Sequence, residues 1–275
     1  MAAEPASVER IRRQGSNSGG FERAVDWELL DHEAHHPGMR VEVRSGELIA
    51  GRERRQRHVF EANRERMAGR VVDVGCDRAA LRSLVSGGSG SYVGLDLFGD
   101  PDVRVDLLSG RPLPLRDRSA DFVVCTDVLE HLYDPHFYCD ELFRISREWV
   151  LIGLPNCWTA GWPAYRAGIP LYKNYGLSPE RHRDAHRWYF CTEESVDFAL
   201  YRAARAGFRC EVMTHFTAGG QAGLAWPGTG PLGRLAGKVS HWGHRLASGV
   251  FERRGSRLWL NRRVESTWWL LRRRP

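Results

Sequence analysis

A β-branched run, a glycine turn and a second apolar run that ends in aspartate constrain this chain most strongly. The first run is VVDV at 71–74, followed by Gly75, and the second is YVGLDLF at 92–98, which contains Asp96. Runs of this kind are buried in parallel sheets, and glycine permits a tight turn with its backbone close to a ligand. The pattern therefore predicts an α/β sheet with a nucleoside-shaped pocket at the carboxyl ends of these strands.

The residues around this pocket favour a nucleoside without phosphates. A carboxylate at the end of a strand, as expected for Asp96, can accept hydrogen bonds from two vicinal ribose hydroxyls. A nicotinamide dinucleotide would also need a G-x-G-x-x-G turn for its pyrophosphate, whereas Gly75 is followed by C-D-R-A at 76–79. The carboxylate of Asp77 would repel phosphate. S-adenosylmethionine is the common cofactor that carries adenosine and no phosphate.

The chain resembles the class I S-adenosylmethionine-dependent methyltransferases, especially the branch that acts on small molecules and quinone-like acceptors. The resemblance covers about residues 55–216 and the last strand. It rests on VVDVGC at 71–76, on the long segment at 103–132 that ends in LEHL, and on EWVLIGLPN at 148–156. It implies a Rossmann-like seven-stranded methyltransferase sheet, mostly parallel with an antiparallel last strand, and with helices on both faces.

The same resemblance implies a set of cofactor-binding residues. Asp73 and Gly75 would face the methionine moiety, and Asp96 would hold the ribose. Asp106 would recognise the adenine amino group, and the backbone carbonyl of Cys125 would lie beside the methionine ammonium. The full set expected to bind S-adenosylmethionine is Asp73, Gly75, Cys76, Asp96, Leu97, Asp106, Leu107 and Cys125.

Two departures from the family pattern bear on this expectation. The family usually has glycine where this chain has Asp77 and Ala79, so side chains are added where cofactor and backbone ordinarily touch. Alanine is tolerated there if its φ is negative, and Asp77 could pair with the cofactor's ammonium or repel its carboxylate. The alternative hypothesis is therefore a degenerate methyltransferase fold that serves as a non-catalytic binding or scaffold subunit. The second departure is the path at 98–102, which is too short for a crossover helix and is expected to be a loop.

For a hydroxyl acceptor, His131 is the expected general base because it follows the fourth strand at the mouth of the cleft, and Asp127 is the second candidate. Alternatively, His131 holds the strand-to-helix turn. Asp127, Glu130 and His131 also share one helical face by spacing, a pattern similar to that of metal-dependent terminal-ribose methyltransferases of small RNAs. Most relatives with LEHL need no metal, so we expect no metal here. His182 and His186 are further catalytic candidates.

We expect residues 1–50 to form a partly disordered N-terminal extension and residues 51–275 to form the methyltransferase domain. The insertion at 157–189 is rich in tryptophan and tyrosine and is interpreted as an aromatic lid over the acceptor, or else as a small local core. The insertion at 218–263 is interpreted as a basic amphipathic cap. Its helix at 231–252 either packs on the domain or lies on anionic lipid as a peripheral membrane contact.

Several local patterns predict individual elements. VEVRSGELIAG at 41–51 alternates around Ser45 and Gly46 like a hairpin, and 52–67 is expected to be an Arg-rich helix. Helices are also expected at 134–147, capped by Asp134, and at 192–206, capped by Thr192 and stopped at Gly207. Strands are expected at 208–216 and 265–273.

Composition limits the function classes. No apolar stretch approaches the ~20 residues that span a bilayer, and the N-terminus lacks a signal-peptide core, so a cytoplasmic protein is expected. The six cysteines are scattered with no C-x-x-C pair, and we expect them to be reduced, mostly buried thiols. The net charge is +6, but of the 40 basic residues only Lys173 and Lys238 are lysine, which weakens an argument for nucleic acid. We therefore expect methylation of O or N on a small molecule, such as a secondary metabolite, glycan or lipid-linked acceptor, and no nucleic-acid partner.

Overall fold

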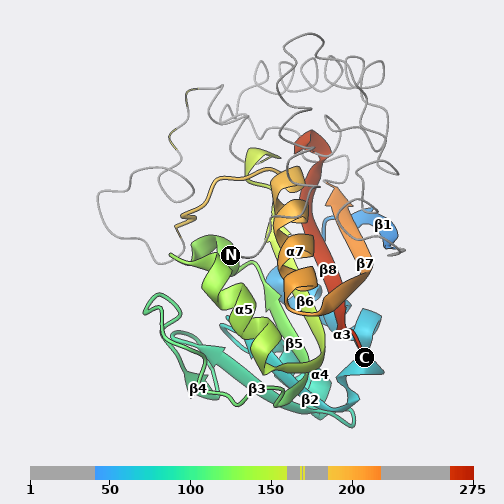
Figure 1. The fold of residues 1–275 in the computed structure, drawn as a ribbon, viewed down its shortest axis with the longest axis vertical. Helices are drawn as coiled ribbons and strands as arrows, with labels where there is room; N and C mark the ends of the chain where they lie inside the picture. The colour runs from blue at the N-terminus through green and yellow to red at the C-terminus, as the bar shows by residue number, and fades with distance from the viewer. Residues whose placement is uncertain (1–40, 160–167, 169, 171–184, 218–260) are drawn as a thin grey trace, which may run out of the picture.

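The computed structural model describes residues 41–159, 168, 170, 185–217 and 261–275, which form a mixed sheet flanked by helices (Figure 1). The sheet order is β1-β7-β8-β6-β5-β2-β3-β4. The strands are β1 Glu42–Glu47, β2 Arg70–Val74, β3 Ser91–Asp96, β4 Val103–Arg104, β5 Ala120–Thr126, β6 Ser146–Pro155, β7 Phe208–Thr217 and β8 Val264–Arg273. Among the strands that the structure describes, only β8 runs antiparallel to its neighbours, β6 and β7. The predicted Rossmann-like sheet with an antiparallel last strand is confirmed.

Within the described residues the sheet has eight strands, one more than the seven expected, because β1 extends it at the β7 edge. The hairpin predicted around Ser45 and Gly46 is wrong. Instead, β1 is a continuous strand parallel to β7, in register from Glu42 opposite Val212 to Glu47 opposite Thr217. The long edge of β7 offers backbone partners to the whole of β1, which satisfies more hydrogen-bonding groups than a local turn would.

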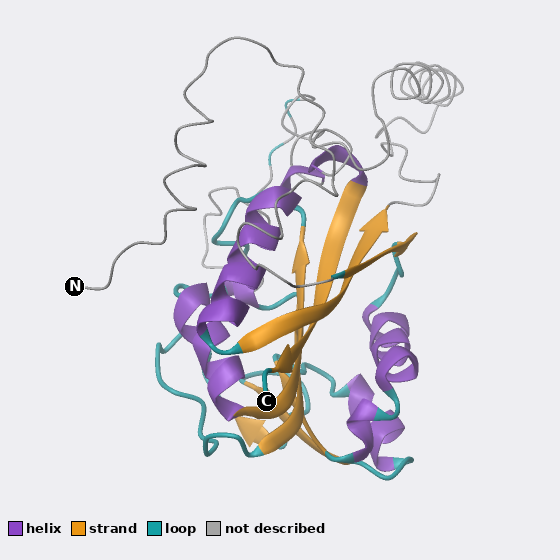
Figure 2. Cartoon of the chain, turned by 45° about the vertical axis from the view of Figure 1, so that its right-hand side comes forward, coloured by secondary structure: helices purple, strands orange, loops and turns teal. Residues whose placement is uncertain are grey.

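The helices are α3 Arg52–Asn63, α4 Ala80–Ser86, α5 Pro135–Ile145 and α7 Thr192–Arg205, with short 3-10 helices η2 Arg66–Ala68 and η3 Leu129–His131. Figure 2 shows helices on both sides of the sheet, as predicted. Side chains of α5 and α7 pack into one hydrophobic core, and those of α3 and α4 pack into a second.

The two tryptophans of β8 show how the sheet separates these cores. Successive side chains of a strand point to opposite faces. Trp269 is fully buried in the core beneath α5 and α7, whereas Trp268 packs with α3 and α4. Both faces of the strand are therefore covered, which explains why this part of the sequence reads as a continuous apolar run.

The path from β3 to β4 is a loop, as predicted. Asp102 donates its backbone N–H to the Gly94 carbonyl at 2.9 Å, and Val105 donates to the Asp96 carbonyl at 2.9 Å. Because β4 is only two residues long, this short connection suffices. It leaves the exits of β3 and β4 side by side.

The helix ends follow local sequence signals, with one correction. The Asp134 side chain accepts a hydrogen bond from the Phe137 N–H at 2.9 Å, and Gly207 follows α7 with a φ of +77°. The predicted cap at Thr192 is wrong, because Thr192 is the first helical residue. Cys191 is the cap, and the Glu194 carboxylate accepts the Cys191 N–H at 2.7 Å in a reciprocal capping box.

All six cysteines are buried free thiols, as predicted. Within the described ranges, no helix is long and apolar enough to cross a membrane. The predicted N-terminal extension up to residue 40, the helix at 231–252 and most of the aromatic lid lie outside the described residues.

Candidate functional site

The carboxyl ends of β2, β3 and β5 bring three predicted site segments to one edge of the sheet. Gly75 follows β2, Asp96 ends β3, and Asp127 follows β5. β2 pairs with both β3 and β5 in parallel register. In open α/β sheets ligands bind at this edge, so the segments expected to hold cofactor and acceptor are brought together.

Asp96 is held ready to accept hydrogen bonds. Its Oδ2 accepts the Asp77 N–H at 2.9 Å, and its Oδ1 accepts the Phe98 N–H at 3.1 Å. A carboxylate oxygen can accept more than one hydrogen bond, so each oxygen keeps capacity for a ribose hydroxyl. The adjoining side chains of Leu97 and Phe98 are 36% and 44% exposed, which provides apolar surface beside the carboxylate. These residues fit the adenosine of S-adenosylmethionine.

The turn at Gly75 requires glycine. Its φ is +78°, and a Cβ at this position would lie only 2.3 Å from Cγ2 of Val128. The Gly75 N–H donates to the Leu95 carbonyl at 2.7 Å, and the Gly75 carbonyl accepts from the Arg52 guanidinium. The turn is thus fixed by β3 on one side and by α3 on the other.

The two residues that replace family glycines adopt left-handed backbone conformations. Asp77 has a φ of 47° and Ala79 a φ of 49°. The condition of negative φ, under which alanine would be tolerated without strain, is therefore not met, and each residue carries a strain of about 1 kcal/mol. The loop is held nevertheless, because the Asp77 carbonyl accepts the Asp100 N–H at 2.7 Å and packs closely against Gly99.

Arg52 also determines what the Asp77 carboxylate can do. The Asp77 Oδ2 lies 3.8 Å from Nη1 of Arg52. The negative charge that could have repelled the cofactor's carboxylate is therefore partly compensated within the protein. The sequence predicted an Arg-rich helix at 52–67 but did not predict this contact. The i, i+3 spacing of Arg52 and Arg55 was the one signal that both arginines lie on the same face of the helix.

Asp73 lies beneath the turn and is only 2% exposed. The Tyr92 hydroxyl donates to its Oδ2 at 2.9 Å. Burial raises the pKa of Asp73 to about 6, although the Tyr92 hydrogen bond and the charge of Arg52 act in the opposite direction. Cys76 is equally buried, so neither side chain lies at the surface of the cleft.

This pKa gives a stability prediction. Because the folded-state pKa is raised from 3.8 to about 6, folded protein binds more protons than unfolded protein between these values. We expect the contribution of Asp73 to the free energy of unfolding to fall by about 3 kcal/mol as pH rises from about 4 to above 6. Urea titrations across this range measure it. Asp73→Asn, whose side chain can still accept the Tyr92 hydrogen bond, should lack this pH-dependent part of the free energy of unfolding. An identical pH profile in both proteins would contradict the raised pKa of Asp73.

Asp106 and Leu107 follow β4, next to the exit of β3. Asp106 is exposed, and its Oδ1 accepts the Leu108 N–H at 2.9 Å, whereas Leu107 is 8% exposed. Cys125 is 1% exposed, near the end of β5. Because the thiol is buried, a cofactor contact at Cys125 would use the backbone, and this role, implied by the family resemblance, stays a prediction.

Asp127 lies at the edge of a small open hollow. Its φ is 56°, and its Oδ2 lies 3.2 Å from Nη2 of Arg55. The hollow is lined by Leu48, Ile49, Arg55, Asp127, Phe216, Ser266 and Trp268. A carboxylate beside mostly apolar surface, with a guanidinium at hand, can orient a polar group of a small ligand.

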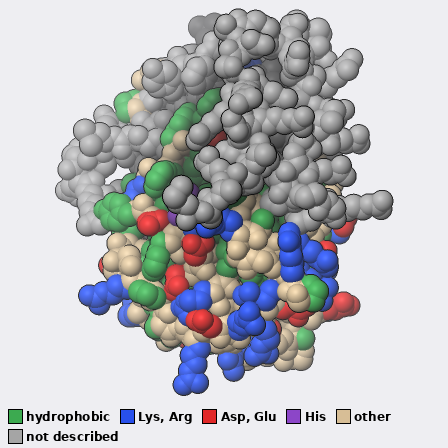
Figure 3. Space-filling model, viewed as in Figure 1, with side chains coloured by type: hydrophobic (Ala, Val, Ile, Leu, Met, Phe, Trp, Pro, Cys, Tyr) green, Lys and Arg blue, Asp and Glu red, His purple; other side chains and the backbone are tan. Residues whose placement is uncertain are grey.

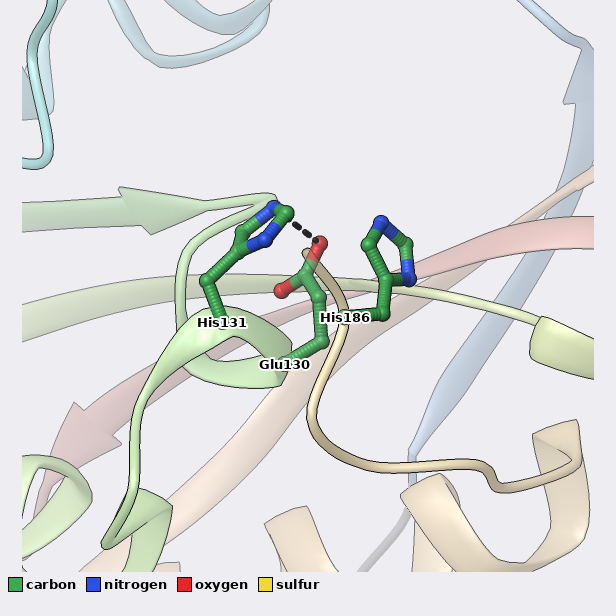
Figure 4. A group of neighbouring side chains, drawn as sticks. All are labelled: Glu130, His131 and His186. Carbon is green, nitrogen blue, oxygen red and sulfur yellow. Dashed lines mark ion pairs between the residues drawn. The ribbon is translucent and has the colours of Figure 1, made fainter. Parts of the chain in front are cut away.

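His131 contacts His186, a neighbour that the sequence analysis did not predict. The interpretation that Asp127, Glu130 and His131 share one helical face is wrong, because Asp127 precedes η3 in a left-handed conformation. Instead, Figure 4 shows Glu130, His131 and His186 turned toward one another. The ring centroids of His131 and His186 lie 4.6 Å apart, edge to face. Burial and the nearby Asp127 raise the pKa of Glu130 well above its ordinary value.

The described ends of the aromatic insertion lie near this cluster. Trp188 donates its indole N–H to the Leu132 carbonyl at 2.8 Å, and the Cys157 N–H donates to the Phe190 carbonyl at 3.0 Å. Trp158, Trp188 and Tyr189 are each more than 40% exposed. The ends of the insertion thus lie at the carboxyl edge of the sheet, where an acceptor lid would be needed.

Comparisons with known proteins match part of the chain to methyltransferases. A family model described as a methyltransferase domain matches residues 72–149. A protein of Mycolicibacterium smegmatis, named a probable S-adenosylmethionine-dependent methyltransferase, is 34% identical over 116 residues that cover 38% of this chain and 45% of that protein. The chain thus spans less than half the length of this curated relative.

The chain also aligns with solved structures at low sequence identity. The structure of a SAM-dependent methyltransferase from Archaeoglobus fulgidus aligns with a TM-score of 0.49 at 15% identity, covering 90% of this chain and 100% of that one. The structure of magnesium protoporphyrin IX methyltransferase from Synechocystis PCC 6803, with bound SAH, aligns with a TM-score of 0.44 at 14% identity. That alignment covers 98% of this chain and 95% of the other.

Proposed function

We propose that this chain, whose residues 72–149 belong to a class I S-adenosylmethionine-dependent methyltransferase domain, transfers a methyl group to an oxygen or nitrogen of a small molecule. The acceptor class is a secondary metabolite, a glycan or a lipid-linked compound. The observation that carries the proposal is the Asp96 carboxylate, fixed by two backbone N–H groups at the same sheet edge as the Gly75 turn.

Methyl transfer requires the protein mainly to position the cofactor and the acceptor. S-adenosylmethionine supplies a methyl group that its sulfonium already activates. In this proposal the Gly75 turn and Asp96 hold the cofactor, and Asp127, which follows the neighbouring strand β5, contacts the acceptor. Alignment and exclusion of water can account for much of the rate.

Asp127 and His131 are the proposed general bases for a hydroxyl acceptor. Asp127 lines the hollow, and its ion pair with Arg55 orients the carboxylate. The ring of His131 faces Glu130 and His186. The structure therefore favours Asp127 over His131 as the base, in the reverse order to that expected from the sequence.

On the face that Figure 3 shows, the described surface favours a small acceptor over nucleic acid. On the face shown in Figure 3, acidic side chains are interspersed with the basic ones over the part that the structure describes. Nucleic-acid binding usually relies on a continuous basic surface.

The proposal also includes a cytoplasmic location and a peripheral membrane contact through residues 231–252.

A turnover assay tests the proposal. The full chain is incubated with methyl-labelled S-adenosylmethionine and a panel of phenols, catechols, amines and glycans, and labelled product is measured. We expect Asp127→Asn to lower kcat by about 100-fold, because a general base contributes about that factor, without weakening cofactor binding. Asp140→Asn, which changes an exposed carboxylate of α5 that pairs with Arg202 of α7, is the matched control and should retain full activity.

The alternative is a scaffold subunit, favoured by the strained Asp77 and Ala79. Absence of turnover with every acceptor, together with absence of S-adenosylmethionine binding, would replace the transferase proposal with this one. Cofactor binding without turnover on the panel would leave the cofactor role in place and contradict only the acceptor class.

A further inference from the structure

We propose that Glu130, His131 and His186 bind one divalent first-row transition-metal ion, with Zn²⁺ as the reference ion. The site lies beside the predicted cofactor loop rather than in it. The inference goes beyond the methyl transfer proposed above and does not depend on it, because it rests on the geometry of these three side chains alone.

The ligand atoms are already close to the spacing that a metal requires. One ligand atom from each of the three side chains lies within 4.8 Å of the other two. The Nε2 of His131 is 3.6 Å from Oε1 of Glu130, which is too long for a hydrogen bond. Metal–ligand bonds of about 2.1 Å in a tetrahedral site separate the ligand atoms by about 3.4 Å. Small side-chain adjustments would therefore complete the site.

One oxygen of the buried Glu130 carboxylate has no hydrogen-bond partner among the described residues. This oxygen is Oε2, and the side chain is 1% exposed. Buried carboxylate oxygens are normally paired, because an unpaired one costs the desolvation of a charged or strongly polar group. Figure 4 shows this carboxylate directed toward the imidazoles, where a cation would satisfy it.

Backbone contacts bring the third ligand from a segment 55 residues away. The Arg187 N–H donates to the Glu130 carbonyl at 2.9 Å, and its guanidinium donates to the carbonyls of His131 and Ala185. The same guanidinium stacks on Tyr133, 4.5 Å from the ring centroid. Arg187 thus fixes the segment, and the His186 ring is left to face Glu130 and His131.

The donor set selects the class of ion. Two imidazole nitrogens and one carboxylate oxygen suit Zn²⁺, Fe²⁺, Mn²⁺ or Co²⁺, whereas Mg²⁺ and Ca²⁺ prefer oxygen ligands alone. Three protein ligands leave at least one coordination position for water or an acceptor oxygen. The sequence had suggested Asp127 as the third ligand, but Asp127 pairs with Arg55, and His186 takes that place. In metal-loaded protein His131 is a ligand and not a base.

Calorimetric titration of tag-free, chelator-treated full-length protein with ZnSO₄ tests the site. We expect one equivalent to bind, and Mg²⁺ to give no saturable signal. Loss of an outer-shell partner already costs 10- to 100-fold in metal affinity, so removal of a ligand in Glu130→Gln or His186→Ala should cost at least about 100-fold. His136→Ala, an exposed histidine five residues after His131, is the matched control and should bind as the wild type does.

Thermal unfolding with and without Zn²⁺ guards against a variant that simply fails to fold. The wild type should gain thermal stability with the ion, and Glu130→Gln should be folded but gain none. Absence of saturable Zn²⁺ binding to the wild type, or wild-type affinity in both ligand variants, would overturn the metal site. Because S-adenosylmethionine binding is measured separately, either proposal can fail while the other stands.

Discussion

Asp96→Ala is expected to weaken S-adenosylmethionine binding by at least about 100-fold. The carboxylate would accept hydrogen bonds from both ribose hydroxyls, and a hydrogen bond to a charged group contributes about 1.5 to 3 kcal/mol. Two such bonds amount to at least about 3 kcal/mol, or about 100-fold in Kd. The loss also removes the acceptor that fixes the N–H groups of Asp77 and Phe98, which loosens the loop. Isothermal titration of purified variants measures this effect.

Asp100→Ala is the matched control for this prediction. Asp100 lies four residues later, in the loop that follows β3, and its carboxylate pairs with Arg82 at the surface. Exposed ion pairs contribute little, so the control should bind the cofactor within about threefold of the wild type. Equal weakening in both variants would mean that the loop as a whole, and not the Asp96 carboxylate, determines affinity. Wild-type binding by Asp96→Ala would remove Asp96 from the site.

Gly75→Ala is expected to abolish cofactor binding and to lower the free energy of unfolding by about 2 to 4 kcal/mol. The added Cβ meets Cγ2 of Val128 at 2.3 Å, and the φ of +78° is strained for any residue with a Cβ. Backbone strain of this kind costs about 1 kcal/mol, and overpacking adds about 1 to 3 kcal/mol. Urea unfolding and a cofactor titration on the same preparation test both parts.

A substitution at Gly110 distinguishes the effect of backbone strain from the effect of overpacking. The φ of Gly110 is +68°, but a Cβ there would meet nothing within 4 Å. Gly110→Ala should therefore show the strain alone, about 1 kcal/mol. Adding Val128→Ala to Gly75→Ala should relieve the clash and reduce the deficit that the overpacking causes. Equal stability of Gly75→Ala and Gly110→Ala would show that close packing of the turn against Val128 is not what requires glycine.

The parts of the fold that local physics determines were predictable from the sequence. The valine run of β2 marks a strand buried on both faces, Asp134 followed by proline marks a helix start, and Gly207 marks a helix end. The antiparallel β8 was expected from the family resemblance. The valine run, Asp134 and Gly207 each lie in or next to the element that they specify, so tertiary context did not need to be known.

Contacts between distant segments were not predictable in this way. β1 pairs with β7 about 170 residues later, and nothing in the local alternation of 41–51 distinguishes that strand from a hairpin. His186 reaches Glu130 because Arg187 ties two segments together. The role of Arg52 depends on its approach to Gly75, which the spacing of arginines in a helix does not specify.

The central claim is that the carboxyl edge of this sheet holds adenosine without phosphates. Titration of the wild-type chain by isothermal calorimetry with S-adenosylmethionine, S-adenosylhomocysteine and ADP tests it most directly. We expect saturable micromolar binding of both S-adenosyl compounds at one site per chain, and much weaker binding of ADP. No saturable binding of either S-adenosyl compound at millimolar concentration, or tighter binding of ADP, would contradict it.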